Sequence, residues 1–290
     1  MKIVVCIKQV PDTRPQIDID PAGKNIVEDG MIYIVNPDDR CAVEAAVSLK
    51  QQIGGEVTLI TLGNNEAEEA LRSCLAMGAD KALILQDKAF DGGDSSATAK
   101  ALAQAIGKMD YDLILTGSHS LDGDHGQVPG AIAEMLGLPF VSGVTSLEKV
   151  TGQKITVHRK LERGDREVVE SILPSVIGVA EGINYPRYAS LPDLISAMRQ
   201  KIEIINASDL GLTSGELGPN GSLTKTYNFT PPRPRPKKIF APDSNLSAAD
   251  RMKQMMSGGA SKKKSGDLLQ GEPEQVAAQI IQFLKDEKII

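Results

Sequence analysis

The chain has 290 residues with a net charge of −6, and its 41% hydrophobic and 24% charged content is typical of a globular protein. The negative charge and the 3% aromatic content without tryptophan argue against a nucleic-acid binder, which needs a basic surface and stacking platforms. No apolar run approaches the roughly 20 residues of a membrane span, and the three cysteines lack metal-type spacing.

In chain order, the first half alternates apolar strand-like runs with helical patterns. Strands are expected at residues 2–9, 57–62, 82–85 and 113–115, and residues 17–35 read as an irregular hairpin. Helices are expected to begin at Asn36, Asn65, Ser95 or Ser96, and Val128. Continuous apolar strands alternating with helices predict an α/β fold, with a parallel, Rossmann-like sheet covered on both faces.

After residue 137 the pattern changes. Residues 140–150, 154–161 and 168–179 read as consecutive strands, partly antiparallel, followed by a loop at 181–192 and a helix at about 191–201. From residue 211 an extended arm is expected. It contains the proline-rich TPPRPRPKK, the flexible SGGASKKKSG, and an amphipathic helix at 273–288. We therefore predict a domain at 1–210 and an arm at 211–290 whose last helix packs on a partner subunit.

The strongest functional signal is the stretch 113–133, in which a strand feeds a loop that opens a helix. This geometry holds phosphates in α/β proteins, because unpaired N–H groups at a helix start favour an anion. Gly123, Gly126 and Gly130 would let the backbone approach a ligand closely. The alternative is a surface loop of turn residues. Cys6, Asn36, residues 62–64 and residues 117–126 are all expected at the same rim of the sheet.

Other kinds of site find little support. His119, Asp122, Asp124 and His125 lie within seven residues, but no further histidine or cysteine completes a metal set. Acidic side chains in a nucleotide-binding loop more often accept hydrogen bonds from ribose hydroxyls or cap a backbone turn. No nucleophile–base pair stands out, and the Walker A and GxGxxG patterns are absent. We expect neither a metal nor a catalytic residue.

Several motifs appear in a fixed order: KIVVCIKQVPDT, NPDD, LAMGADKA, DGDHGQV and NYPRYASLPDLISA. Together they resemble the β subunit of electron transfer flavoproteins over residues 1–210. The resemblance implies an adenine-nucleotide-hydrolase-like fold, and a heterodimer with an α subunit that carries the redox-active FAD. It implies that this chain binds a nucleotide and does no bond-making chemistry alone. The three cysteines without metal-type spacing make a cytoplasmic, reduced protein the simplest interpretation.

Carried over position by position, the resemblance assigns two sets of residues. The loop 181–192 would dock into a flavin dehydrogenase through Pro186, Arg187, Tyr188 and Leu191. The alternative for Leu191 is a first-turn helix residue packed within its own chain. The nucleotide would contact Cys6, Asn36, Pro37, Asp38, Asp39, Leu62, Asp122, Gly123, Asp124, His125, Gly126, Gln127, Val128, Pro129, Gly130, Ala131 and Ala133.

The identity of the nucleotide depends on the branch of the family. The housekeeping branch holds AMP, and the electron-bifurcating branch holds a second FAD that accepts a hydride from NADH. The bifurcating loop usually reads DGDTAQVGP, whereas residues 122–130 read DGDHGQVPG. Pro129 removes an N–H donor and His125 adds a possible one. We expect FAD, with an acyl-CoA or 2-hydroxyacid dehydrogenase and ferredoxin as electron partners, and AMP as the alternative.

Two other classes stay open. One is a nucleotide-binding regulator of the universal-stress kind, which would need no partner for the arm. The other is an adenylating or pyrophosphatase enzyme. The Ser-Gly-Gly-type phosphate loop that such enzymes carry after their first strand is missing, and Cys6-Ile7-Lys8-Gln9 stands in its place.

Overall fold

The computed structural model describes residues 1–15, 17–22, 25–230, 246–256, 271 and 273–286. The chain divides into two compact units, Met1–Pro231 and Pro232–Ile290, and each is described by itself. No described helix is long and apolar enough to cross a membrane.

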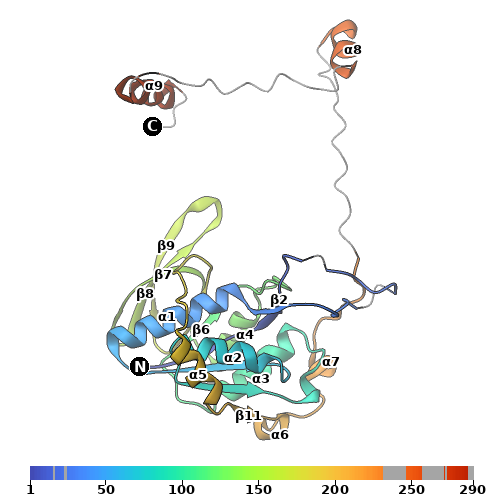
Figure 1. Ribbon diagram of the computed structural model, residues 1–290, viewed down its shortest axis with the longest axis vertical. Helices are drawn as coiled ribbons and strands as arrows, with labels where there is room; N and C mark the ends of the chain where they lie inside the picture. The colour runs from blue at the N-terminus through green and yellow to red at the C-terminus, as the bar shows by residue number, and fades with distance from the viewer. Residues whose placement is uncertain (16, 23–24, 231–245, 257–270, 272, 287–290) are drawn as a thin grey trace. The chain divides into compact units, whose positions relative to one another are not determined.

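The first unit is built on a nine-stranded sheet with the order β11-β5-β4-β1-β6-β10-β7-β8-β9 (Figure 1). All neighbours from β11 to β7 pair in parallel, whereas β7, β8 and β9 pair antiparallel. The predicted parallel α/β sheet is therefore confirmed. The strands are β1 (Lys2–Cys6), β4 (Glu56–Leu62), β5 (Lys81–Leu85), β6 (Leu113–Gly117), β7 (Phe140–Thr151), β8 (Lys154–Lys160), β9 (Arg166–Ile172), β10 (Ser175–Val179) and β11 (Glu203–Ile205).

Helices cover both faces of this sheet. Alternate residues of β1 enter different cores, Ile3 and Val5 on one side and Val4 and Cys6 on the other. Burial on both faces explains why β1 reads as an unbroken apolar run. The first core holds α1 (Pro37–Ile53) and α2 (Ala67–Leu75), the second holds α3 (Ser95–Ile106) and α4 (Val128–Leu136), and α5 (Leu191–Arg199), α6 (Ala207–Leu210) and α7 (Gly218–Gly221) follow.

Two expected strands differ from the structure. The run 2–9 is interrupted after Cys6, and the short β2 (Gln9–Pro11) pairs antiparallel with β3 (Tyr33–Val35) in a separate sheet. The run 168–179 is two strands, β9 and β10, which are separated by Leu173 and Pro174. The second of these, β10, enters the parallel sheet between β6 and β7.

The expected helix caps are corrected at three positions. The side chains of Asn36 and Asn65 make no cap hydrogen bond to the helices that follow them. Helix α3 is capped by Asp94, which accepts from Ser96 N and Ala97 N at 3.0 Å each. A carboxylate one position earlier replaces the predicted serine hydroxyl.

The first unit continues past the expected boundary at residue 210. Asp94 Oδ2 accepts from Leu223 N at 2.9 Å and Thr224 N at 2.7 Å, and Lys100 pairs with Glu216 at 2.6 Å. These bonds hold residues 213–224 against α3.

The second unit contains α8 (Ala248–Met256) and α9 (Pro273–Asp286), and α9 confirms the predicted amphipathic helix. The flexible segment expected at 257–266 lies outside the described residues, as does most of the proline-rich segment. That α9 packs on a partner subunit stays a prediction.

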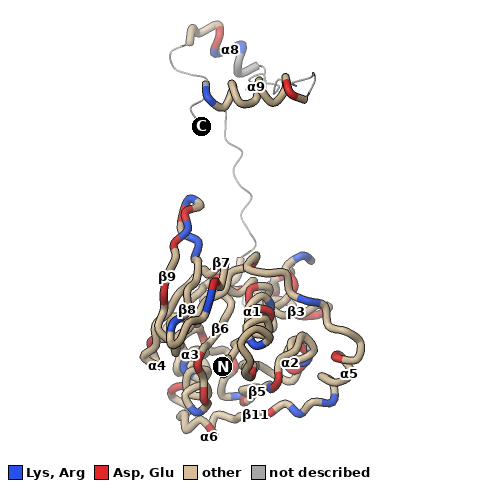
Figure 2. The backbone as a smooth tube through the Cα atoms, turned by 90° about the vertical axis from the view of Figure 1, so that its left-hand side faces the viewer, with Lys and Arg blue, Asp and Glu red and all other residues tan. Residues whose placement is uncertain are grey.

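Acidic and basic side chains are interspersed along the first unit (Figure 2). The antiparallel extension is an example, because Lys154 pairs with Glu170 at 2.9 Å across β8 and β9, and Arg159 with Glu167 at 3.4 Å.

Candidate functional site

The carboxyl ends of β1, β4 and β6 lie next to one another in the sheet. The segments that follow these strands therefore meet at one rim, where ligands bind in open α/β sheets. They are Ile7-Lys8 after β1, Gly63-Asn64 after β4, and residues 118–127 after β6, named here the β6–α4 loop. The structure thus brings together the segments that the sequence predicted at this rim.

The first turn of α1 binds these strand ends from one side. Asp39 is buried, and its two carboxylate oxygens accept from Lys8 N at 2.8 Å and Gly117 N at 2.7 Å. A Cβ atom at position 117 would lie 2.2 Å from Asp39 Oδ1. Only glycine therefore lets α1 approach the end of β6 this closely.

Asn36 and Asp38 bind the β6–α4 loop itself. Asn36 Nδ2 donates to His119 O at 2.8 Å, and its Oδ1 accepts from Leu121 N at 3.0 Å. Asp38 Oδ2 accepts from His119 N at 3.1 Å. The Asn36, Asp38 and Asp39 side chains thus shape the loop through bonds to its backbone and to the strand ends, and their direct contact with a nucleotide stays a prediction.

The backbone of the β6–α4 loop is tightly curled, and a side chain from the segment after β1 forms an ion pair with it. Asp124 and Gly126 adopt left-handed backbone conformations, with φ of 50° and 60°, and a Cβ on Gly126 would come within 2.8 Å of the His119 ring. Lys8 Nζ pairs with Asp122 at 2.6 Å. Burial alone would raise the pKa of Asp122. Hydrogen bonds, of which the one from Lys8 has the larger effect and the one from Ser120 the smaller, outweigh this effect of burial, so the pKa is lowered. Contacts within the chain therefore fix the conformation of the loop at the rim.

Two helix starts flank the tip of the loop. His125 Nδ1 lies 3.5 Å from Ser95 Oγ, at the start of α3. Helix α4 begins directly after the loop, with Pro129 buried in its first turn, and the first N–H groups of a helix have no intrahelical partner. An anion at the start of α4 would be stabilised, whereas the first N–H groups of α3 are already bound by the Asp94 carboxylate. Residues 128, 130 and 131 lie in this first turn of α4.

Four other residues that were predicted to contact the nucleotide lie in the core behind the rim or outside the β6–α4 loop. Cys6 is 7% and Ala133 is 1% exposed, so both belong to the core behind the rim. Burial raises the pKa of the Cys6 thiol, which leaves it protonated and unreactive. Leu62 and Pro37 are half-buried. Contact of these side chains with a nucleotide stays a prediction.

Sequence reasoning did not single out Lys8 or Ser95 as site residues. Lys8 had a usable signal, since it follows the first strand directly and must lie at the rim. Ser95 was considered only as a helix cap. Among the residues that the structure describes, no group of three or more His, Cys, Asp or Glu side chains is placed to hold a metal ion.

The segment that links β10 to α5, residues 180–190, is named here the β10–α5 loop. Arg187 binds the buried Glu44 of α1 through Nε at 2.8 Å, Nη2 at 2.8 Å and its backbone N at 3.0 Å. Asn184 Nδ2 donates to Cys41 O at 3.0 Å, and the Arg40 guanidinium lies 5.9 Å from the Tyr188 ring centre. Helix α1 therefore supports both this loop and the β6–α4 loop.

This support leaves large apolar side chains facing solvent. Tyr185 is 98%, Tyr188 92% and Leu191 70% exposed. Exposed aromatic and aliphatic side chains on a braced loop are typical of a protein–protein contact. Among the predicted docking residues, Tyr188 and Leu191 are exposed, whereas Arg187 is an anchor that holds the loop on α1.

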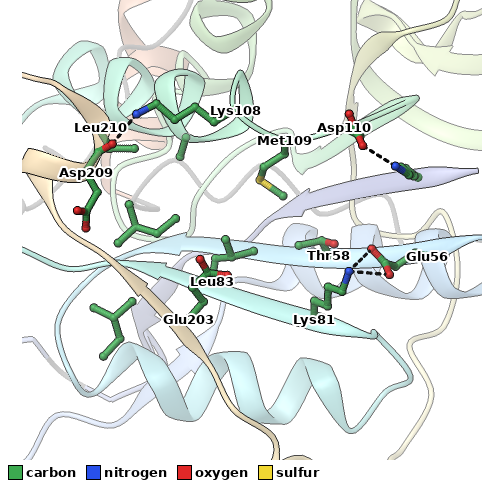
Figure 3. Close-up of a pocket in the computed structure, with 14 residues that line it drawn as sticks. Glu56, Thr58, Lys81, Leu83, Lys108, Met109, Asp110, Glu203, Asp209 and Leu210 are labelled. Carbon is green, nitrogen blue, oxygen red and sulfur yellow. Dashed lines mark hydrogen bonds and ion pairs between the residues drawn. The ribbon is translucent and has the colours of Figure 1, made fainter.

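A groove of about 490 Å³ lies at the opposite, amino-terminal ends of the strands (Figure 3). Its charged side chains bind one another, with Lys81 to Glu56 at 2.8 Å and Lys2 to Asp110 at 2.6 Å. Lys108 Nζ also donates to Asp209 O at 2.5 Å. These lysines are paired within the chain, so the groove is a weaker candidate than the rim.

The buried Asp39 predicts a specific pH dependence of stability. Burial raises its pKa to about 7, although hydrogen bonds from Lys8 N and Gly117 N oppose the shift. In the unfolded chain the same carboxyl titrates near pH 4. The stabilisation linked to its proton is therefore complete below about pH 4 and lost as the pH rises through about 7.

We expect the unfolding free energy of the wild-type protein to include a decline between about pH 4 and about pH 7 that the Asp39→Asn variant lacks, because asparagine cannot ionise. Urea denaturation of both proteins across this range measures the difference. Equal slopes for the two proteins would contradict the assignment.

Comparisons with known proteins point to one family. The family model described as the electron transfer flavoprotein domain matches residues 24–210. A relative named electron transfer flavoprotein subunit beta, from Thermoanaerobacterium thermosaccharolyticum, is 43% identical over 242 residues, which is 83% of this chain and 92% of the relative. A second relative of that name, from Bacillus subtilis, is 33% identical over 288 residues, 99% of this chain and 98% of the relative.

A third relative is named caffeyl-CoA reductase-Etf complex subunit CarD, from Acetobacterium woodii. It is 43% identical over 235 residues, which is 80% of this chain and 88% of the relative.

Proposed function

The chain belongs to the electron transfer flavoprotein β-subunit family, and on this premise we propose that it is the β subunit of a heterodimer that passes electrons through FAD. The α subunit is its partner. The electrons pass between NADH or ferredoxin and a flavin dehydrogenase of the acyl-CoA or 2-hydroxyacid type. A cytoplasmic location is part of the same proposal.

The observation that carries the proposal is the curled β6–α4 loop between the starts of α3 and α4. Its residues are compatible with a nucleotide, because α4 begins directly after the loop without a side-chain cap and its first N–H groups favour a phosphate. FAD, when bound, supplies the hydride and single-electron chemistry. The residues of this chain bind and orient it: the loop holds the phosphates, and Asn36, Asp38 and Asp39 hold the loop.

We propose FAD rather than AMP for this loop, and with it electron bifurcation. The CarD relative supports an electron partner that acts on a CoA thioester, since its name places it in a caffeyl-CoA reductase–Etf complex. The His125-Gly126 pair is compatible with the curled backbone of this loop, because Gly126 adopts the left-handed conformation next to His119. AMP in this subunit, in a non-bifurcating carrier, is the alternative.

We also propose that the β10–α5 loop and the first turn of α5 dock into the dehydrogenase, with Leu191, the first residue of α5, as the anchor. The exposed Tyr185, Tyr188 and Leu191 support this role, and so does the ordering of the loop on α1. A stand-alone regulator of the universal-stress kind would have no need of such an apolar loop. Helix α9 is proposed to pack on the α subunit, because Ile280 and Phe283 are 44% and 59% exposed.

Co-expression with the α partner, followed by denaturing release and quantification of nucleotides, tests the proposal. We expect two FAD and no AMP per heterodimer, with NADH reducing the flavin. One FAD and one AMP would contradict bifurcation and leave a plain electron carrier. Failure of any α subunit to co-purify would contradict the heterodimer itself.

A further inference from the structure

The β6–α4 loop and the β10–α5 loop begin side by side. They follow neighbouring parallel strands, in which Gly117 of β6 is paired with Val179 of β10. Just beyond this pair, Ser118 N donates to Val179 O at 2.8 Å. The proposed nucleotide site and the proposed docking site are therefore adjacent at their roots, although the loops then diverge.

One side chain joins the two loops directly. Asp38 Oδ2 accepts from His119 N in the β6–α4 loop at 3.1 Å, and Asp38 Oδ1 accepts from Glu181 N in the β10–α5 loop at 2.8 Å. The Asp38 side chain lies in the first turn of α1, and each oxygen serves one loop. Its neighbours do not share this role, since Asn36 and Asp39 bind only the loop and strand ends of β1 and β6.

Beyond Glu181 the β10–α5 loop has its own attachments to α1. Asn184 binds the Cys41 carbonyl, and Arg187 binds the Glu44 carboxylate. Asp38, Cys41 and Glu44 are three residues apart and share one side of α1. The loop is thus fixed at its start by Asp38 and further along by Glu44, and only the first attachment also contacts the β6–α4 loop.

We propose that Asp38 is a positioning residue that couples nucleotide binding in the β6–α4 loop to the order of the β10–α5 docking loop. A nucleotide that orders the first loop holds the His119 N–H in place, which fixes the Asp38 carboxylate and with it the Glu181 N–H. By linkage, a partner that orders the docking loop strengthens nucleotide binding by the same factor. This inference rests on the proposed function, because it needs a nucleotide in the first loop.

Hydrogen exchange of the full-length chain, in the complex in which it is purified, tests the coupling. The nucleotide-depleted protein is compared with protein reloaded with AMP as the probe, because AMP is also the adenylate half of FAD. We expect AMP to slow exchange in residues 117–127 and also, by about fivefold or more, in residues 180–190.

Two variants isolate Asp38. Asp38→Asn keeps one acceptor oxygen and replaces the other by an NH₂ group, so it cannot accept from both loops. In this variant the ratio of AMP protection in 180–190 to that in 117–127 should fall well below the wild-type ratio. The matched control is Glu44→Gln, which weakens the far attachment of the docking loop and spares Asp38. Its docking loop should exchange faster, yet AMP should still slow exchange at Glu181.

The possible outcomes distinguish this inference from the proposed function on which it rests. Protection of 117–127 without any change in 180–190 of the wild-type protein would overturn the coupling and leave the nucleotide site intact. Retained coupling in Asp38→Asn would overturn the role of Asp38. Absence of protection in both segments would overturn the nucleotide site, and the coupling with it.

Discussion

Gly117→Ala should destabilise the folded protein by about 3 kcal/mol. The added methyl would lie 2.2 Å from Asp39 Oδ1 and 2.8 Å from Asp38 Cβ, where α1 meets the end of β6. Either the helix moves away, which breaks the 2.7 Å bond from Gly117 N to Asp39, or the strand end distorts. Since the Asp39 carboxylate also binds Lys8 N, the displacement reaches the end of β1 as well.

Urea-induced unfolding followed by circular dichroism measures this loss, since the chain has no tryptophan for fluorescence. The matched control is Gly215→Ala, because a Cβ there meets nothing within 4 Å, and its effect should stay within about 0.5 kcal/mol. A Gly117→Ala protein as stable as this control would show that the junction is not close-packed. The variant should also retain less nucleotide on purification, because the β6–α4 loop leaves from Gly117.

Leu191→Ala should raise the KM for the dehydrogenase partner by about 10-fold to 100-fold with little change in kcat. A Leu side chain that becomes fully buried on binding contributes roughly 1.5–3 kcal/mol, most of which alanine forfeits. Leu191 is 70% exposed in the free chain, so this contribution is available to a partner. Docking strength changes, whereas the flavin chemistry does not.

Steady-state electron transfer at varied dehydrogenase concentration gives the two constants separately. Leu223→Ala is the matched control, since Leu223 is 84% exposed and lies outside the β10–α5 loop; it should leave the KM unchanged. An unchanged KM for Leu191→Ala, together with a loss of stability well above 0.5 kcal/mol, would instead favour the reading in which Leu191 packs within its own chain.

Much of the fold was predictable from local pattern. The strands β4, β5 and β6 read as apolar runs because helices cover both faces of the sheet, and helices α1 to α4 read from their apolar spacing. The position of β10 was not predictable, because an apolar run shows that a strand is buried but not which strands it pairs with. Its entry between β6 and β7 depends on long-range contacts.

The candidate site, like the fold, was predictable from the sequence only in part. The turn residues and glycines of 117–126 predicted a ligand loop at the rim of the sheet, because the strand-to-helix loops of a parallel sheet all lie at the carboxyl ends of its strands. The NPDD motif was read as a helix start with local capping and as nucleotide contacts. The structure gives its side chains other partners, since Asn36 binds residues 119 and 121, and Asp38 binds residues 119 and 181.

The sequence by itself determined that this chain is a parallel α/β protein of the electron transfer flavoprotein β-subunit family, and it predicted a phosphate-binding loop at the rim of the sheet. These properties follow from local periodicity, turn chemistry and motifs that are contiguous in the chain. Only the tertiary structure decided that Asp38 joins two loops 62 residues apart, from His119 to Glu181, and that Arg187 anchors on the buried Glu44. Such contacts depend on which strands become neighbours, and that is set by the packing of the whole sheet.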